Sequence, residues 1–334
     1  MADAVPPLSP PPVNGSIYPG NRTFTFGYDD LYQLTSATGH YTGCAFGCGS
    51  GRNYSLGMTY DGIGNITHKT QADAIVPTTG TPTTQTATSY NVAYTYTPGG
   101  RPHAPQSVGT QALTYDTDGN QTTSTGTFDV ARTMTWTEDD RLRSEADRNA
   151  TTTFLYDAAG NRTHKRRTTL ETVYVTPYYT VRNYVTQSKH VMFGDTRIAT
   201  VMATIRTAGA PTTAVGQSAF YYLPDHLQST TLATDASGAI TQHEEYFPSG
   251  ETWFEEQRNG DARNAQPYLF SSKELDETGL YYFGARYLDG MDKEVYYHRI
   301  SGIWLVHWCQ TWKGTIVCRD PKHLETFFAS SRVR

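Results

Sequence analysis

The sequence has few charged residues, no basic excess and no long apolar run. Asp, Glu, Lys and Arg make up 18% of its 334 residues, below the roughly 25% of average globular domains. The net charge of −5 predicts no nucleic-acid partner, because such binding depends on clustered Lys and Arg. No apolar stretch approaches the about 18 residues of a membrane-spanning helix. Residues 1–20 contain six prolines and no apolar signal core, so we expect neither a signal peptide nor a membrane span.

Cysteine is also scarce, and the four cysteines are Cys44, Cys48, Cys309 and Cys318. Four are too few for a disulfide framework in a chain of this length. The two pairs have three and eight intervening residues, which matches no common zinc module. We therefore expect no metal and no cofactor. A loop disulfide and free thiols remain alternative states of these cysteines.

Residues that favour extended backbone are abundant. The chain has 24 Tyr and is rich in Thr, and both side chains lose χ1 freedom in a helix but pack well on a pleated surface. The 29 Gly and 17 Pro punctuate these segments, as turns between strands require. The composition predicts an all-β fold.

An internal repeat has the pattern Tyr-Asp-x-x-Gly-Asn-x-Thr. It occurs in residues 60–67, 115–122 and 156–163, and degenerate copies begin at Tyr28, Tyr96 and Trp136. Self-similarity at a short period indicates one supersecondary unit that is used many times. We interpret the aromatic residue that leads each copy as a packing residue, with a sugar-binding platform as the alternative.

The chemistry of one copy predicts a β-hairpin. Asp157 suits the first position of a turn, where its carboxylate accepts backbone N–H groups, and Gly160 supplies the left-handed residue of that turn. Asp140 replaces this glycine in one copy and tolerates the same conformation, whereas Tyr32 in the first copy has no physical explanation. A lone hairpin is marginal in water, so serial hairpins should pair edge to edge into a curved or spiral sheet.

Four further motifs follow the repeats in order: residues 221–229, 234–238, 245–251 and 273–287. Together with the repeats they resemble the YD-repeat, or Rhs (rearrangement hotspot), family and its repeat-associated core, which includes toxin-complex C components. The resemblance implies a hollow β-shell that encapsulates a C-terminal toxin. It divides the chain into a flexible Pro-rich N-terminus (1–22), a YD-repeat hairpin region (23–206), the associated core (207–289) and a divergent tail (290–334).

The resemblance also implies an aspartyl autoprotease, in which one carboxylate activates water and a second, protonated carboxyl polarises the scissile carbonyl. Asp276 occupies the place of one family aspartate. The second should follow Tyr287 and fall near Arg299, and its motif is missing. We therefore predict that the chain is not an enzyme. Asp276 remains a lone, vestigial autoprotease candidate and is expected to be a surface turn residue.

Three core positions depart from the family pattern. Gln228 and Ser272 stand where the family usually has Gly, and Ser249 stands where Phe is usual. A glycine replaced at a position of positive φ costs about 1 kcal/mol or more. These departures suggest a truncated copy.

The remaining segments are loops and the tail. Residues 78–88 and 207–217 are predicted to be exposed loops. In the tail, Trp304, Trp308 and Trp312 recur every four residues, which would place the indoles on one face of a helix. About 45 residues are few for an independent toxin, so the tail is predicted to be non-catalytic.

The predicted function is a non-catalytic shell fragment of a toxin-delivery or cell-contact protein. The implied partners are other shell or toxin-complex components or its own C-terminal cargo, and the implied location for the family is secreted or at the cell surface. Two alternatives stay open. The tail 290–334 could be a small toxin, or exposed aromatic rows could bind cell-surface glycans as a surface-binding module.

Overall fold

The structure, a computed structural model, describes residues 17, 20–46, 49–207, 210–257, 267–289, 295–296, 309–312 and 315–318. Within these residues the chain is built from strands, with a single short 3-10 turn, η3 (Phe270–Ser272). The all-β prediction is therefore confirmed. The same residues include no helix that is long and apolar enough to span a membrane.

Most of the strands belong to one antiparallel sheet of 21 strands. Strands adjacent in the chain pair with each other, as serial hairpins should, and β4 pairs with both β5 and β6. The strands are β1 (Asn21–Tyr28), β2 (Leu34–Gly43), β3 (Ser50–Tyr60), β4 (Ile66–Val76), β5 (Thr83–Thr84), β6 (Tyr90–Tyr96), β7 (Pro105–Val108), β8 (Gln111–Tyr115), β9 (Gln121–Thr125), β10 (Arg132–Trp136), β11 (Leu142–Ala146), β12 (Thr151–Tyr156), β13 (Arg162–Arg167), β14 (Leu170–Thr176), β15 (Tyr179–Arg182), β16 (Thr186–Phe193), β17 (Thr196–Thr207), β18 (Ala210–Pro224), β19 (Thr230–Thr234), β20 (Ile240–Tyr246) and β21 (Thr252–Gln257).

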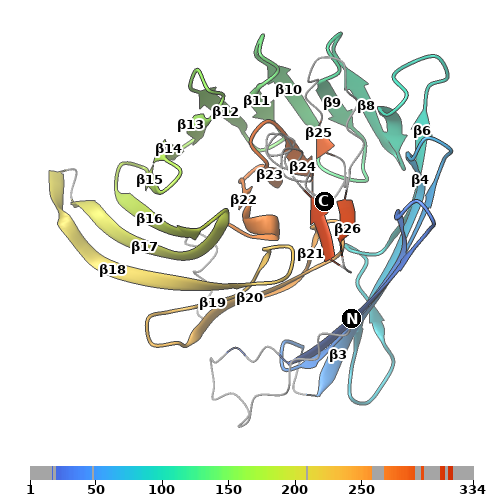
Figure 1. The fold of residues 1–334 in the computed structure, drawn as a ribbon, viewed down its shortest axis with the longest axis horizontal. Helices are drawn as coiled ribbons and strands as arrows, with labels where there is room; N and C mark the ends of the chain where they lie inside the picture. Colours follow the sequence, from blue (N-terminus) through green and yellow to red (C-terminus); the bar gives the residue numbers. More distant parts are fainter. Residues whose placement is uncertain are drawn as a thin grey trace, which may run out of the picture.

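The sheet curls around a second, smaller sheet. Figure 1 shows the long sheet bending round and the C-terminal strands lying on its concave side. The smaller sheet contains β22 (Glu274–Leu275), β23 (Leu280–Tyr282), β24 (Tyr287–Asp289) and β25 (Val295–Tyr296). We call residues 267–289 the plug and the long sheet the wall.

The repeat turns have the predicted geometry. The Asp157 carboxylate accepts the backbone N–H groups of Ala159 at 2.9 Å and Asn161 at 2.8 Å. The backbone N–H of Gly160 donates to the Asp157 carbonyl at 2.9 Å, and Gly160 has a φ of 78°. The aspartate thus satisfies the amides of its own turn, which explains its recurrence.

The aromatic residue that leads each turn binds the preceding hairpin. Each ring is partly buried and its polar tip donates to the carbonyl of the first residue of an earlier strand. The bonds are Tyr60 Oη to Leu34 O (2.8 Å), Tyr96 Oη to Ile66 O (3.0 Å), Tyr115 Oη to Pro105 O (2.9 Å), Trp136 Nε1 to Gln121 O (2.7 Å) and Tyr156 Oη to Leu142 O (2.9 Å). These residues therefore tie neighbouring hairpins together, as the packing interpretation predicts.

Positions that replace glycine retain its backbone conformation. Asp140 has a φ of 55° and Tyr32 a φ of 61°. Gln228 has a φ of 66° and Ser272 a φ of 56°. Both positions at which the resemblance predicts glycine therefore lie in the left-handed region. Each carries a strain of about 1 kcal/mol that glycine would not.

Two predictions for loops and the tail are wrong. Residues 207–217 do not form a loop, because β17 and β18 form one long hairpin, with Thr207 opposite Ala210. Trp312 lies in a strand, β26 (Cys309–Trp312), which pairs with β27 (Thr315–Cys318) and excludes a helix there. Trp304 and Trp308 lie outside the described residues. The predicted loop at 78–88 is exposed and holds only the short β5.

The two ends of the wall meet through side chains. Tyr41 and Tyr54, from β2 and β3, pack against Trp253 and Phe254 of β21 in one buried aromatic cluster. The ring centroids of Tyr41 and Phe254 are 4.6 Å apart, and those of Tyr54 and Trp253 are 4.9 Å apart. Within the described residues β1 and β21 do not pair. The backbone of the wall is thus open in these residues, and side chains join its two ends: this aromatic seam, the Arg22–Glu245 ion pair and the hydrogen bond from Trp253 Nε1 to Asp73 at 3.1 Å.

Candidate functional site

The plug packs on the concave face of the wall through two apolar clusters. Leu280 and Tyr287 of the plug join Met134, Leu142 and Phe154 of the wall. The hydroxyls of Tyr287 and Tyr156 hydrogen-bond at 2.9 Å. A second cluster contains Tyr246 of the wall and Leu269, Tyr281 and Leu288 of the plug. The acidic segment 274–277 of the plug lies against β13.

Asp276 lies at this contact and is buried. Only 3% of the residue is exposed, so the prediction of a surface residue is wrong. The guanidinium of Arg162 donates to both carboxylate oxygens, from Nη1 at 2.5 Å and from Nη2 at 3.1 Å. The ammonium of Lys165 donates to Oδ1 at 2.8 Å. Both oxygens of the predicted site residue are therefore occupied by cations of the wall.

Asp276 nevertheless occupies a turn of the repeat type. Its backbone N–H donates to the carbonyl of Leu280 at 2.9 Å, and the N–H of Gly279 donates to the Asp276 carbonyl at 2.9 Å. In the wall repeats the aspartate carboxylate binds its own turn. Here the Thr278 hydroxyl accepts the N–H of Leu280 instead, at 3.3 Å. The same backbone turn thus releases the carboxylate for a contact with another strand.

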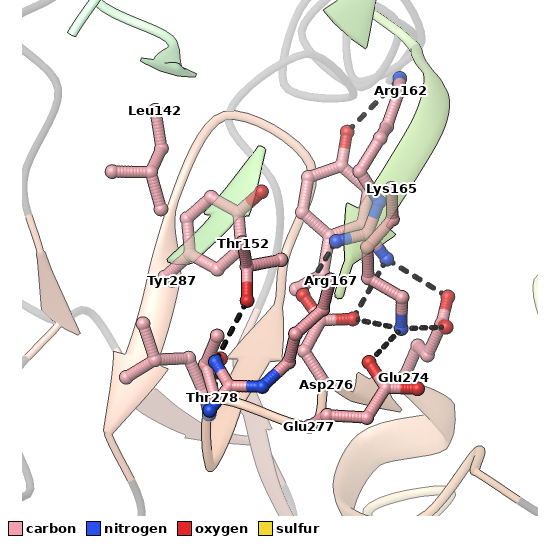
Figure 2. Close-up of polar contacts among 12 residues, drawn as sticks. Leu142, Thr152, Arg162, Lys165, Arg167, Glu274, Asp276, Glu277, Thr278 and Tyr287 are labelled. Atoms are coloured by element: carbon pink, nitrogen blue, oxygen red, sulfur yellow. Dashed lines mark hydrogen bonds and ion pairs between the residues drawn. The ribbon is translucent and has the colours of Figure 1, made fainter. Parts of the chain in front are cut away.

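Two more carboxylates join the cluster. Glu274 accepts hydrogen bonds from Lys165 at 2.8 Å and from Arg162 at 2.9 Å. Glu277 lies 3.0 Å from the Lys165 ammonium. Figure 2 shows the Lys165 ammonium among the carboxylates of Glu274, Asp276 and Glu277. We call these five residues the ion-pair cluster.

The charges of the ion-pair cluster depend on each other. Burial alone would raise the pKa of Glu274, but Lys165 and Arg162 lower it to about 2. Burial raises the pKa of Asp276 against the same two cations, with the neighbouring Glu274 adding to the rise. Burial also works against the charged Lys165, yet Asp276 and Glu274 hold its pKa above the usual value. Two cations therefore compensate three acidic groups in a buried contact.

The last residue of the plug, Asp289, is held in the same way. Arg132 of β10 binds the carboxylate of Asp289 at 2.7 Å and donates to the carbonyl of Thr278 at 3.0 Å. Arg132 also binds Asp129 at 2.8 Å. Arginine suits this role because its planar fork binds several acceptors at once. Buried charges therefore join the plug to the wall both in its middle and at its last residue.

The geometry suits attachment better than catalysis. A carboxylate that activates water must accept its proton, and the cations Arg162 and Lys165, which hydrogen-bond to the Asp276 oxygens, favour the charged form and oppose this protonation. Position 299, where the second family aspartate is expected, lies outside the described residues. Among the described residues no group of three metal-ligating side chains occurs, and Cys44 is in a disulfide bond, so its thiol is not a free ligand.

A cavity of about 270 Å³ lies between the plug and the wall. Its lining includes Ser188 and His190 of β16 and Tyr268 and Glu274 of the plug. The Arg197 guanidinium lies 3.4 Å from the centroid of the Tyr268 ring. Burial lowers the pKa of His190 to about 3, so this ring is neutral. The lining is mixed, with Met202 and Pro267 beside these polar groups, and His190 hydrogen-bonds to the Thr180 hydroxyl at 3.2 Å.

Sequence reasoning missed the basic half of the ion-pair cluster. Arg162 fills the variable position of the Gly-Asn-x-Thr motif, where the other copies have Ile66 and Gln121. Arg162 and Lys165 are both buried on the inner face, although strict alternation would place residues three apart on opposite faces. A β-bulge where β13 pairs with Leu155 and Tyr156 shifts the alternation between them. A charge at an inward position is a signal of a buried partner.

Ser249, the third departure from the pattern of the resembling family, accepts a hydrogen bond from the buried Lys69 ammonium at 2.9 Å.

Comparison with known proteins relates the chain to toxin complexes. No protein-family model matches it. Toxin subunit YenC1 of Yersinia entomophaga is 34% identical over 97 residues, which cover 29% of this chain and 10% of that protein. The Photorhabdus luminescens Tc holotoxin pore has a TM-score of 0.64 at 23% identity, covering 84% of this chain and 14% of that one. A TcdB2–TccC3 crystal structure has a TM-score of 0.63 at 23% identity, covering 83% and 14%. The chain thus spans about a tenth of the curated relative and about a seventh of each structure. It shares the fold of part of the Tc toxin complex and is related in sequence to a toxin-complex subunit.

Proposed function

We propose that this chain is a structural segment of a toxin-complex shell, in which the wall forms part of the enclosure and the plug closes it from within. The observation that carries this proposal is the attachment of residues 267–289 to the concave face through buried ion pairs at Asp276 in the middle of the plug and at Asp289, its last residue. Charged side chains are rarely buried unless a specific partner compensates them. Such an arrangement supports a fixed internal position for the plug.

The finer role follows from the YD-repeat and Rhs resemblance. In this proposal residues 23–206 are the repeat wall and 207–289 the associated core. The wall encloses polypeptide that follows the plug, and its partners are other components of a secreted toxin complex. The likeness of the wall to part of the Tc holotoxin supports this role.

The proposed role is non-catalytic. Asp276 acts as an anchor for the plug because Arg162 and Lys165 occupy its carboxylate. A protease of the aspartyl type would need that carboxylate beside a second one, with water between them. The residue retained from the family motif therefore has a structural use in this chain.

Hydrogen–deuterium exchange tests the internal position of the plug. In the purified full chain we expect amides of residues 280–282 and 287–289 to exchange as slowly as those of β12 and β13, because they pair in a buried sheet. Exchange as fast as that of the exposed turn 157–160 would contradict the proposal. An intact mass of 37.1 kDa after incubation in mild acid is expected, and cleavage after the plug would contradict the non-catalytic part.

A further inference from the structure

Most aspartate turns of the wall lie on one rim, whereas the turns of Asp147 and Asp235 lie on the opposite rim. Antiparallel strands reverse direction at each turn, so alternate turns fall at the same end of the sheet. Direct bonds join successive turns at this end: Asn65 Nδ2 donates to Pro102 O at 2.8 Å, and Asn120 Nδ2 donates to the Asp140 carboxylate at 2.8 Å. We call this end the turn rim, and it comprises residues 29–32, 61–64, 97–104, 116–119, 137–140, 157–160, 177–178, 194–195, 225–228 and 247–250.

The most exposed large apolar side chains gather at the turn rim. Among the described residues, every such side chain that is more than half exposed lies in one of its turns or within two residues of one. They are Leu31 (75%), Tyr32 (69%), Ile63 (55%), Leu155 (59%), Val175 (57%), Tyr178 (60%) and Phe193 (79%). On the opposite rim, Tyr184 and Val185 reach only 49% and 39%. Exposed apolar groups gathered at one edge are typical of an interaction surface.

The turn rim is also acidic. Its turns contain Asp29, Asp30, Asp61, Asp116, Asp118, Glu138, Asp139, Asp140, Asp157, Asp195 and Asp225, against Arg101 as the one Lys or Arg within the turns and Arg141 directly after one of them. The backbone N–H and side chain of Asn161 lower the pKa of Asp157, so this exposed carboxyl stays charged at neutral pH. A complementary surface therefore has to bring positive charge together with apolar contact area.

We propose that the turn rim is a docking surface for another protein, whose contact face is basic and apolar. Phe193 and Tyr178 project from neighbouring hairpin tips and supply the apolar anchors. The backbone beneath them is tied together, since the N–H of His190 donates to the Tyr178 carbonyl at 2.8 Å. The acidic turns supply long-range attraction and discriminate against acidic partners. An anionic membrane does not fit this surface, because its charge has the same sign. The inference does not depend on the shell function proposed above.

The test uses a fluorescent peptide of alternating Lys and Leu as the probe and the full chain as the binding protein. Fluorescence anisotropy should report saturable binding that weakens several-fold between about 0.05 M and about 0.5 M NaCl, because salt screens exposed charges. A matched peptide of alternating Glu and Leu should not bind. The double variant Leu31→Ser, Phe193→Ser should weaken binding about tenfold, whereas Val185→Ser on the opposite rim should not change it.

Three outcomes would overturn the proposal. They are equal binding of the acidic and basic peptides, equal loss in the Val185→Ser control, and unchanged affinity in the Leu31→Ser, Phe193→Ser variant. The three rim and control residues are exposed, so all variants should keep the wild-type far-UV circular dichroism spectrum. Binding to zwitterionic or anionic phosphatidylserine vesicles, but not to the basic peptide, would assign the rim to a membrane and also refute the proposal.

Discussion

Replacement of Arg162 by Met is the sharpest perturbation of the ion-pair cluster. Arg162 compensates Asp276 and Glu274, and its guanidinium also lies 4.0 Å from the centroid of the Tyr282 ring. The variant Arg162→Met keeps most of the apolar stem but leaves Lys165 as the remaining cation of the cluster. Breaking a buried pair on one side costs about 3–5 kcal/mol, because the partner charge stays buried without compensation. We expect a loss of that size in the free energy of unfolding.

Equilibrium unfolding in urea measures this loss, and Arg166→Met is the matched control. Arg166 lies on the same strand but is exposed, and exposed substitutions usually change stability by less than about 0.5 kcal/mol. The double variant Arg162→Met, Asp276→Asn should recover part of the loss, with a coupling energy of about 1–3 kcal/mol between the two positions. A loss below about 1 kcal/mol for Arg162→Met, or an equal loss for Arg166→Met, would refute the assignment of this cluster as the anchor of the plug.

Three further predictions concern other parts of the chain. Gln228→Gly should raise the free energy of unfolding by about 0.5–1 kcal/mol, because residue 228 has a φ of 66°; a decrease in urea unfolding would contradict the strain argument. Trp253→Ala should cost about 3–5 kcal/mol, because the side chain is 1% exposed within the aromatic seam, and thermal unfolding by calorimetry would show the lowered Tm. Although burial opposes it, Glu245 and Glu256 raise the pKa of His243, so its stabilising contribution is complete below the unfolded value of about 6.5 and disappears as pH rises through the folded pKa. The stability difference between wild type and His243→Gln should therefore shrink from pH 5 to pH 9, and a constant difference would exclude this linkage.

The local elements of this fold could be predicted from the sequence because their determinants are local. Asp157 and Gly160 adopt the turn that their spacing predicts. The left-handed conformation of Asp140 follows from the same comparison of repeats. The small and Thr-rich residues 207–217 have the composition of a loop. Pairing across β17 and β18 overrides that weak local preference.

Only the acidic part of the candidate site could be predicted from the sequence. The family motif identifies Asp276, but the position of its carboxylate depends on Arg162 and Lys165, more than a hundred residues earlier in the chain. Repeat spacing defines each hairpin and does not define which face of the wall a later segment contacts. For this reason the sequence placed Asp276 at the surface, whereas the structure buries it.

The aromatic seam has a consequence for the evolution of such chains. A barrel closed by hydrogen bonds fixes its number of strands, because tilt and stagger must match at the junction. Here Tyr54 and Trp253 join the two ends with side chains alone, and ring packing tolerates small changes in angle and offset. A hairpin could therefore be gained or lost by recombination between copies without destroying a backbone junction. By this route the same repeat can form enclosures that differ in their number of hairpins and in their circumference.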